Sequence, residues 1–73
     1  YFNIDDIVTK NADSYIGKIV EINEAGRLRI FWSHRINKSG ELVEMADKKR
    51  TWLQPVAVHH TTIQAAKEAV RAL

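Results

Sequence analysis

The chain has no cysteine, a single proline and only three glycines among its 73 residues. Without cysteine, a disulfide scaffold and a zinc site built from thiolates are both excluded. No apolar run approaches the roughly 18 residues that a membrane-spanning helix needs, and no signal-peptide pattern opens the sequence. We therefore expect an intracellular, cytoplasmic protein that does not act at a membrane.

What is present is the composition of a folded domain. Apolar residues make up 45% of the chain and charged residues 27%, a balance too apolar for a disordered tail. This length suffices for one domain, which we expect to span residues 1–73. A monomer of this size has little volume for an enclosed active site, so we expect a non-catalytic protein with no cofactor and no small-molecule substrate.

Charge is segregated along the chain, although the net charge is only +2. Residues 1–26 carry two basic and five acidic side chains, a net charge of −3. Residues 27–50 carry seven basic and three acidic side chains, a net charge of +4. The basic middle predicts a surface that faces a polyanion. The alternative is that acidic and basic strands lie side by side and neutralise each other.

The clearest structural pattern is an alternation between residues 27 and 35, which predicts a strand. One face of that strand would carry Leu28, Ile30 and Trp32, and the other would carry Arg27, Arg29 and Phe31. Such alternation is typical of an antiparallel sheet with one buried face. Residues 17–23 are rich in β-branched side chains and predict the preceding strand. The hairpin between the two strands needs a positive φ, which Gly26 adopts most easily.

Shorter segments complete a mainly β pattern. We expect further strands at 4–9, 41–45, 50–54 and 56–59, and polar turns at 11–14, 37–40 and 46–49. Pro55 has no backbone N–H to donate and should end the strand before it.

The periodicity changes after residue 60 and predicts a helix over about 62–73. Its apolar stripe consists of Ile63, Ala66, Val70 and Leu73. Thr61 and Gln64 have the spacing of a capping box, with Thr61 as N-cap. A helix this short is marginal alone, so it must dock on the sheet to persist.

Four to five short strands followed by one helix favour a small, strongly bent antiparallel barrel over about 4–59, with the C-terminal α-helix added to it. The order of motifs resembles the SH3-like small barrels, which include the Tudor, chromo-barrel and KOW-type modules. The resemblance covers roughly residues 4–58 and is carried by the segments 6–8, 17–20, 26–32 and 52–56. It implies a binding module, because Tudor and chromo-barrel relatives read methylated side chains and KOW-type relatives bind nucleic acid or the transcription and translation machinery.

The first candidate site is a nucleic-acid-binding surface centred on the polar face of the strand at 27–35. Guanidinium groups pair with phosphates, and an exposed aromatic ring offers a surface on which bases stack. The candidate residues are Arg27, Arg29, Phe31, Arg35, Lys38, Lys48, Lys49 and Arg50. The alternative is that Phe31 packs under the C-terminal helix and the arginines are simply solvated.

The second candidate site is an aromatic cage formed by Tyr15, Trp32 and Trp52, which would hold a cation. The alternative is that these rings build the core, as large rings often do in small proteins. We expect no metal site, because His59 and His60 would point to opposite faces of a strand. Ser33 and His34 lack a partner acid in the sequence nearby, so we expect no catalytic residues.

The sequence therefore favours a module that binds an anionic partner, with nucleic acid or a ribonucleoprotein surface as the leading candidate. The alternative is a protein–protein adaptor that uses an aromatic groove or a homo-oligomer interface.

Overall fold

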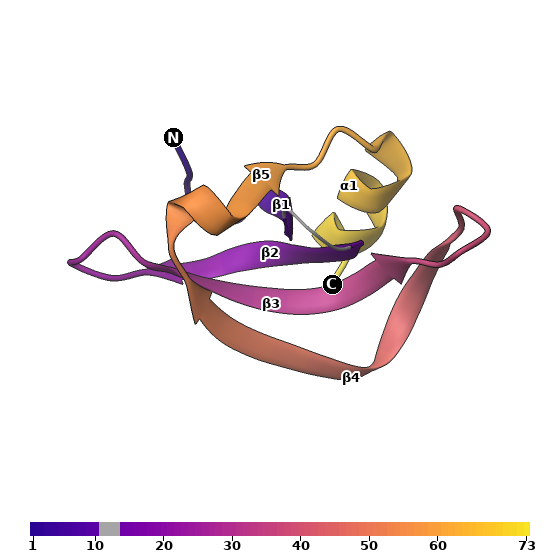
Figure 1. The fold of residues 1–73 in the computed structure, drawn as a ribbon, viewed down its shortest axis with the longest axis horizontal. Coiled ribbons are helices and arrows are strands. Elements are labelled where there is room, and N and C mark those ends of the chain that lie inside the picture. Colours follow the sequence, from indigo (N-terminus) through magenta and orange to yellow (C-terminus); the bar gives the residue numbers. More distant parts are fainter. Residues whose placement is uncertain (11–13) are drawn as a thin grey trace.

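The computed structural model describes residues 1–10 and 14–73, which form five strands, one 3₁₀ turn and one α-helix (Figure 1). The elements are β1 (Ile7–Lys10), β2 (Tyr15–Ile22), β3 (Leu28–Ile36), β4 (Leu42–Leu53), η1 (Pro55–Ala57), β5 (Val58–His60) and α1 (Gln64–Arg71). Of the polar turn expected at 11–14, all but Ser14 lies outside the described residues.

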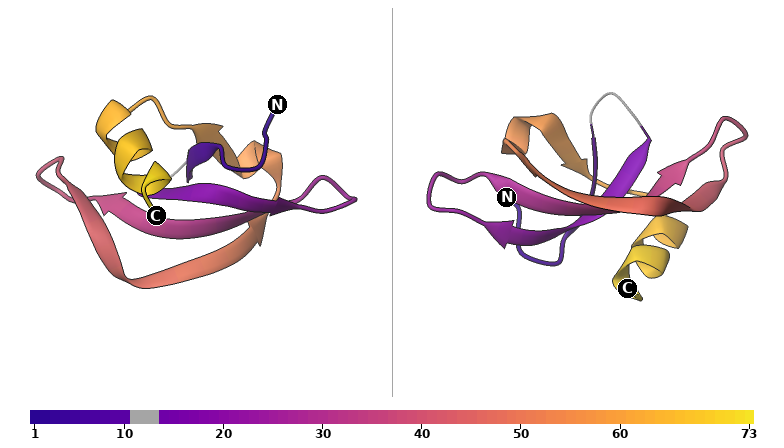
Figure 2. Two further views of the ribbon diagram at one scale, coloured as in Figure 1. Left: turned by 180° about the vertical axis from the view of Figure 1, so that it is seen from behind. Right: turned by 90° about the horizontal axis from the view of Figure 1, so that it is seen from below.

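The five strands form one antiparallel sheet in the order β4-β3-β2-β1-β5. The sheet bends strongly, so that β4 curves away below β3 while β5 and β1 lie above β2 (Figures 1 and 2). The described strands do not close into a barrel, because β4 and β5 do not pair with each other and remain the two edges. The expected mainly β fold with a C-terminal helix is confirmed, whereas the barrel is not.

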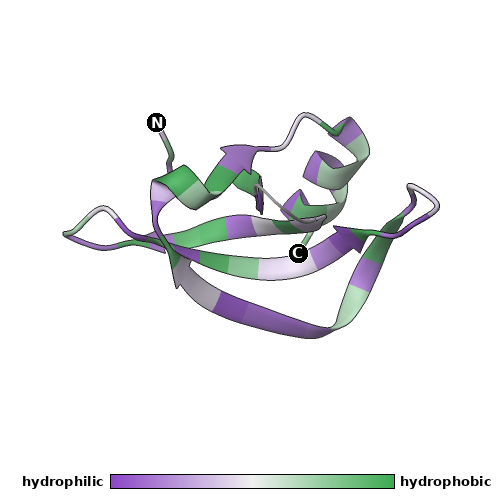
Figure 3. Cartoon of the chain, viewed as in Figure 1, coloured by the Kyte–Doolittle hydropathy of each residue, from purple (hydrophilic) through white to green (hydrophobic). Residues whose placement is uncertain are grey.

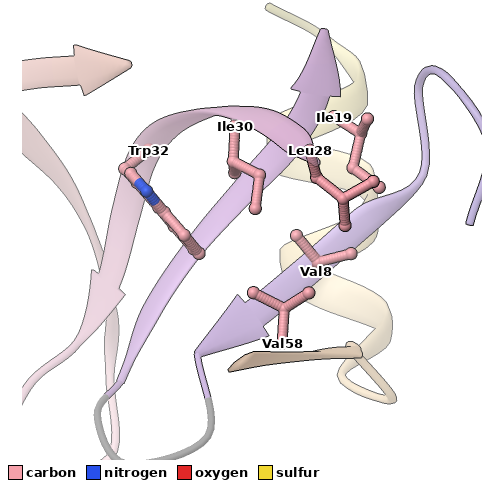
Figure 4. Packing of buried hydrophobic residues seen from close by; sticks show 6 residues of the cluster. All are labelled: Val8, Ile19, Leu28, Ile30, Trp32 and Val58. Atoms are coloured by element: carbon pink, nitrogen blue, oxygen red, sulfur yellow. The ribbon is translucent and has the colours of Figure 1, made fainter. Parts of the chain in front are cut away.

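The inner face of the bent sheet holds the larger core. Its buried members are Val8, Ile19, Leu28, Ile30, Trp32 and Val58, which point toward one another from four strands (Figure 4). The predicted alternation of β3 is confirmed here, since Leu28, Ile30 and Trp32 are all buried. Apolar burial on this face is the main force that holds the bend.

The helix covers one end of the opposite, outer face. Ala66 and Val70 pack there on Ile7 and Ile16, with partly buried Ile36 and Leu42 at the margin. This end lies toward the hairpin between β3 and β4, and the hairpin between β2 and β3 projects at the other end (Figure 2). The rest of the outer face is therefore left uncovered by the helix.

The expected details of the helix are correct only in part. Ala66 and Val70 have no exposed surface, but Ile63 and Leu73 are 45% and 49% exposed, so the apolar stripe is shorter than predicted. The capping box is wrong: the helix begins at Gln64, and Ile63 is the N-cap without a side-chain hydrogen bond. Instead, the Thr61 hydroxyl accepts a hydrogen bond from the backbone N–H of Ile63 at 3.3 Å, and so stabilises the turn before the helix.

Replacing Val70 with aspartate should lower the free energy of unfolding by about 2–3 kcal/mol, because the carboxylate would enter an apolar contact. The same change at exposed Leu73 should cost only about 0.5 kcal/mol and serves as the matched control. Thermal or urea unfolding of the two variants measures the difference. Equal stabilities would show that the helix is not docked.

One further expectation, a polar turn at 46–49, is wrong. Residues 42–53 form a single strand, which merges the two short strands expected at 41–45 and 50–54. The pairing with β3 is irregular between Trp32 and His34, where the register shifts. An edge strand tolerates this polar stretch because its side chains reach water, and Figure 3 shows the hydrophilic run along β4.

The boundaries of the remaining elements follow from their turns. The strand at 4–9 begins only at Ile7, because Asp5 has a positive φ of 75° and the chain turns there. Pro55 follows the end of β4, as expected, and opens the 3₁₀ turn, which delays β5 to Val58. Gly26 adopts the predicted positive φ, 82°, in the hairpin between β2 and β3.

Candidate nucleic-acid interface

The uncovered part of the outer face is organised by the strand register into two rows of side chains across β2, β3 and β4. In the first row, Phe31 pairs with Lys18 on one side and Arg50 on the other. In the second row, Arg29 lies between Glu21 and Trp52. Directly paired residues share one face of a sheet, so the rows stand next to each other on the outer surface.

The two aromatic rings each contact an arginine of the neighbouring strand. The guanidinium carbon of Arg50 lies 4.7 Å from the centre of the Phe31 ring. That of Arg29 lies 5.8 Å from the Trp52 ring. Each of the strands β3 and β4 contributes one arginine and one ring. The face therefore carries two cation–π pairs, each formed between the two strands. These contacts place each guanidinium group beside a ring on the surface of the sheet.

Acidic side chains neutralise part of this basic surface. Glu21 contacts Arg29 at 3.5 Å, and both side chains are about half exposed. Lys48 contacts Glu44 at 2.8 Å and also donates to the Met45 carbonyl at 3.0 Å. The hydrogen bond from the Lys48 ammonium, together with its positive charge, lowers the pKa of the Glu44 carboxyl. The interpretation in which acidic and basic strands neutralise each other therefore holds for Glu21 and Arg29, whereas Lys48 and Glu44 lie on the same strand.

The structure brings together only some of the residues expected at the nucleic-acid site. Arg29, Phe31 and Arg50 form one cluster on the outer face. Phe31 is not among the residues that pack with the helix, contrary to the alternative considered for it. Lys48 forms an ion pair with Glu44 instead. The remaining candidates are dispersed. Arg27 and Lys38 lie in the hairpins, Lys49 lines the inner pocket, and Arg35 lies near the far end of β3.

Two of the three proposed cage residues meet in a pocket on the inner side of the sheet. Tyr15 and Trp32 line it together with Met45, Asp47 and other residues around a volume of about 280 Å³. The ammonium of Lys10 lies 5.2 Å from the centre of each ring, so a cation of the chain itself already sits between them. Trp32 also donates from its indole N–H to the Thr51 hydroxyl at 2.8 Å.

Trp52 lies outside this pocket. It pairs with Arg29 on the outer face and is 39% exposed. The sequence assigned it to the cage or the core, but its position opposite Arg29 makes it part of the basic surface. We call the group Lys18, Arg29, Phe31, Arg50 and Trp52 the arginine–aromatic face.

Ser33 and His34 form a hydrogen bond at 2.8 Å between the hydroxyl and Nδ1. An acid does lie nearby, contrary to the sequence-based expectation, because Glu44 pairs with His34 across the strands. Ser33 nevertheless has no exposed surface and His34 is only 6% exposed. A substrate could not reach the hydroxyl without opening the sheet, so this group is a structural contact within the sheet.

The environment of His34 makes stability depend on pH. Burial lowers its pKa, the Glu44 carboxylate opposes this shift, and the Lys48 ammonium adds to it. In the unfolded chain His34 has a pKa near 6.5. Just below that pH the imidazole is therefore protonated in the unfolded state but stays neutral in the folded state. Stability from this group is therefore complete above pH 6.5 and falls as the pH drops toward the folded pKa.

We expect the melting temperature to decline between about pH 7 and pH 5. The variant His34→Asn, whose amide can keep a hydrogen bond to Ser33, should flatten that decline. Thermal melts of both proteins across this range measure the effect. A slope that is unchanged in His34→Asn would assign the pH dependence to another group.

The other two histidines lie on β5. His60 contacts the Asp6 carboxylate at 2.9 Å and stacks on Phe2 at 4.6 Å. Burial opposes the charge of Asp6, but the backbone N–H of Asn3 and the His60 imidazole together lower the pKa of its carboxyl. Within residues 1–10 and 14–73, no group of three histidine or acidic side chains is placed to hold a metal ion.

No protein-family model, curated protein or solved structure significantly matches this chain. In the part of the chain that the structure describes, no helix is both long enough and apolar enough to cross a membrane.

Two contributors to these sites, Lys18 and Lys10, were missed in the sequence, and Trp52 was assigned to the wrong site. Lys18 and Trp52 belong to the arginine–aromatic face because of the pairing of β2 and β4 with β3. Lys10 belongs to the pocket because β1 directs it toward Tyr15. A sequence signal existed for Lys18, which sits in an alternating strand, but none fixed the register that brings these residues together.

Proposed function

We propose that the protein is a non-catalytic binding module of the SH3-like class, and that its arginine–aromatic face binds nucleic acid. The observation that carries the proposal is the pair of cation–π contacts between β3 and β4. They pre-orient two guanidinium groups, and Lys18 adds a third positive charge in the adjacent strand. A nucleic-acid ligand also agrees with the expected cytoplasmic location.

Pre-orientation matters because an arginine loses side-chain entropy when it binds a phosphate. Arg29 and Arg50 are already held against rings, so less freedom remains to be lost. They are diagonal neighbours on adjacent strands, and such residues lie about 7–8 Å apart, with their Cβ atoms somewhat closer. Two cations at this separation can contact different phosphates of one strand, and guanidinium groups bind phosphate through two parallel hydrogen bonds.

The test is a titration of a fluorescently labelled, mixed-sequence single strand at several salt concentrations, followed by anisotropy. Three phosphate contacts predict a log–log slope of about −2, which is about a 15-fold loss of affinity for a fourfold rise in salt. No binding of DNA or RNA at low salt would remove the proposal, because electrostatic association is strongest there.

A second candidate function is the binding of a methylated or free ammonium group in the Tyr15–Trp32 pocket. It is favoured by one observation, the ammonium of Lys10 held 5.2 Å from both rings. The Asp47 carboxylate in the lining would add electrostatic attraction for a cation. An external ligand would have to displace Lys10.

The variant Lys10→Met removes that competing charge while keeping a long apolar side chain. Under this second candidate it should bind a trimethyllysine peptide more tightly than the wild type does, as measured by calorimetry. Trp32 is part of the core, so Tyr15→Ala is the better variant for abolishing the binding. If neither the wild type nor Lys10→Met binds the peptide, the pocket serves only to hold Lys10.

A further inference from the structure

The two aromatic rings of the arginine–aromatic face differ in how much of each is available to a ligand. Phe31 stands on the interior strand β3, with Lys18 on one side and Arg50 on the other. The Arg50 guanidinium lies close over its ring at 4.7 Å, and the side chain is partly buried. Phe31 is therefore placed to support Arg50 and has little free surface for a ligand.

Trp52 stands on β4, which is an edge of the described sheet. It has a neighbouring strand on one side only, and it is 39% exposed although it is a large apolar side chain. Arg29 approaches one face of its indole ring loosely, at 5.8 Å. The indole therefore combines an accessible aromatic ring with a position beside an arginine.

We infer that the arginine–aromatic face selects single-stranded nucleic acid, and that a base stacks on the indole of Trp52 while Arg29 and Arg50 bind the neighbouring phosphates. This inference rests on the proposed function and assigns its ligand class and its stacking residue. The occupant follows from the chemistry, because a ring that contacts one arginine and lies two residues from another on the same strand matches a base next to phosphates.

A duplex fits this arrangement less well. Its bases are stacked on each other and cannot lie flat on a side chain without being extruded, which costs unpairing energy. A single strand has unstacked bases that can lie on any aromatic ring, whatever their identity. We therefore expect little sequence preference and a clear preference for single strands over duplexes of equal length.

The experiment compares two labelled oligonucleotides of equal length and charge, oligo(dT) and a strand of abasic sites, by fluorescence anisotropy. The wild type should bind oligo(dT) roughly tenfold or more tightly than the abasic strand, because only the former can stack. Trp52→Ala should bind both strands with the low affinity of the abasic one. Trp52→Phe should restore most of the preference, since a ring returns to the same place.

Phe31→Leu is the matched control, because it removes the other ring of the face and keeps an apolar side chain. It should keep the preference for oligo(dT), although its overall affinity falls where Arg50 loses its support. Circular dichroism of each variant verifies that it is folded.

The outcomes distinguish a failure of base stacking from a failure of nucleic-acid binding. If the wild type binds oligo(dT) and the abasic strand equally well, the stacking of a base on Trp52 is disproved, while electrostatic binding of the strand remains supported. If Phe31→Leu loses the preference and Trp52→Ala keeps it, the stacking residue is wrongly assigned. If neither strand binds at low salt, the proposed function fails together with the inference.

Discussion

Replacing Gly17 with alanine is expected to destabilise the protein by about 3 kcal/mol. A Cβ at this position would meet the carbonyl oxygen of Phe31 at 2.6 Å, the Cγ2 of Ile30 at 2.8 Å and the Cε3 of Trp32 at 2.9 Å. The first of these is a backbone atom of the paired strand and cannot turn aside. Urea unfolding followed by circular dichroism measures the loss.

The control for this prediction is Gly26→Ala, where a Cβ meets nothing within 4 Å but the φ is +82°. That variant should lose only about 1 kcal/mol, which is the cost of the unfavourable backbone angle. A Gly17→Ala protein as stable as the Gly26→Ala protein would mean that β2 and β3 are not so closely packed. It would also mean that the Trp32 ring, a member of the inner core, does not pack closely on Gly17.

Reversing two charges on the arginine–aromatic face is expected to reduce nucleic-acid affinity at least about 100-fold. In Arg29→Glu/Arg50→Glu, two charge-assisted hydrogen-bonding groups are lost, each worth about 1.5–3 kcal/mol, and repulsion is added. Both residues lie on the solvent side of the sheet, so the fold should persist. Anisotropy titration at low salt, with a melting curve for each protein, measures both effects.

Two further variants make this prediction specific. Glu21→Gln removes the carboxylate that contacts Arg29 at 3.5 Å and should increase the affinity. Reversal of Lys38, which lies in the hairpin between β3 and β4, should have a much smaller effect. Equal losses from Lys38→Glu and from the double reversal would indicate that net charge alone, and not this face, governs binding.

The sequence was most informative where a local pattern determines the structure. The alternation of Leu28, Ile30 and Trp32 fixed the buried face of β3, and Gly26 fixed the hairpin, because both depend on neighbouring residues alone. Val70 was correctly assigned to the buried side of the helix for the same reason. The first strand was placed too early because the apolar Ile4 suggested a strand, although the turn-forming Asp5 has a positive φ and delays the strand.

The sequence was least informative where structure depends on pairing between distant strands. The polar residues at 46–49 resemble a turn, yet they continue an edge strand because one side of it faces water. Trp52 has an apolar neighbour in Leu53, which suggested a core position. Only its pairing with Arg29 places it on the outer face. The irregular register opposite Ser33 decides which residues of β4 face outward, and no local pattern encodes it.

The position of the ligand on the protein tests the central claim most directly. A titration of ¹⁵N-labelled protein with oligo(dT), followed by heteronuclear NMR, reports on every backbone amide and on the two indole N–H groups. We predict that the largest shift changes cluster on β2, β3 and β4 around Lys18, Arg29 and Arg50, and that the Trp52 indole shifts strongly while the Trp32 indole does not. Changes confined to the Tyr15–Trp32 pocket, or a Trp52 signal that stays fixed at saturation, would contradict the account.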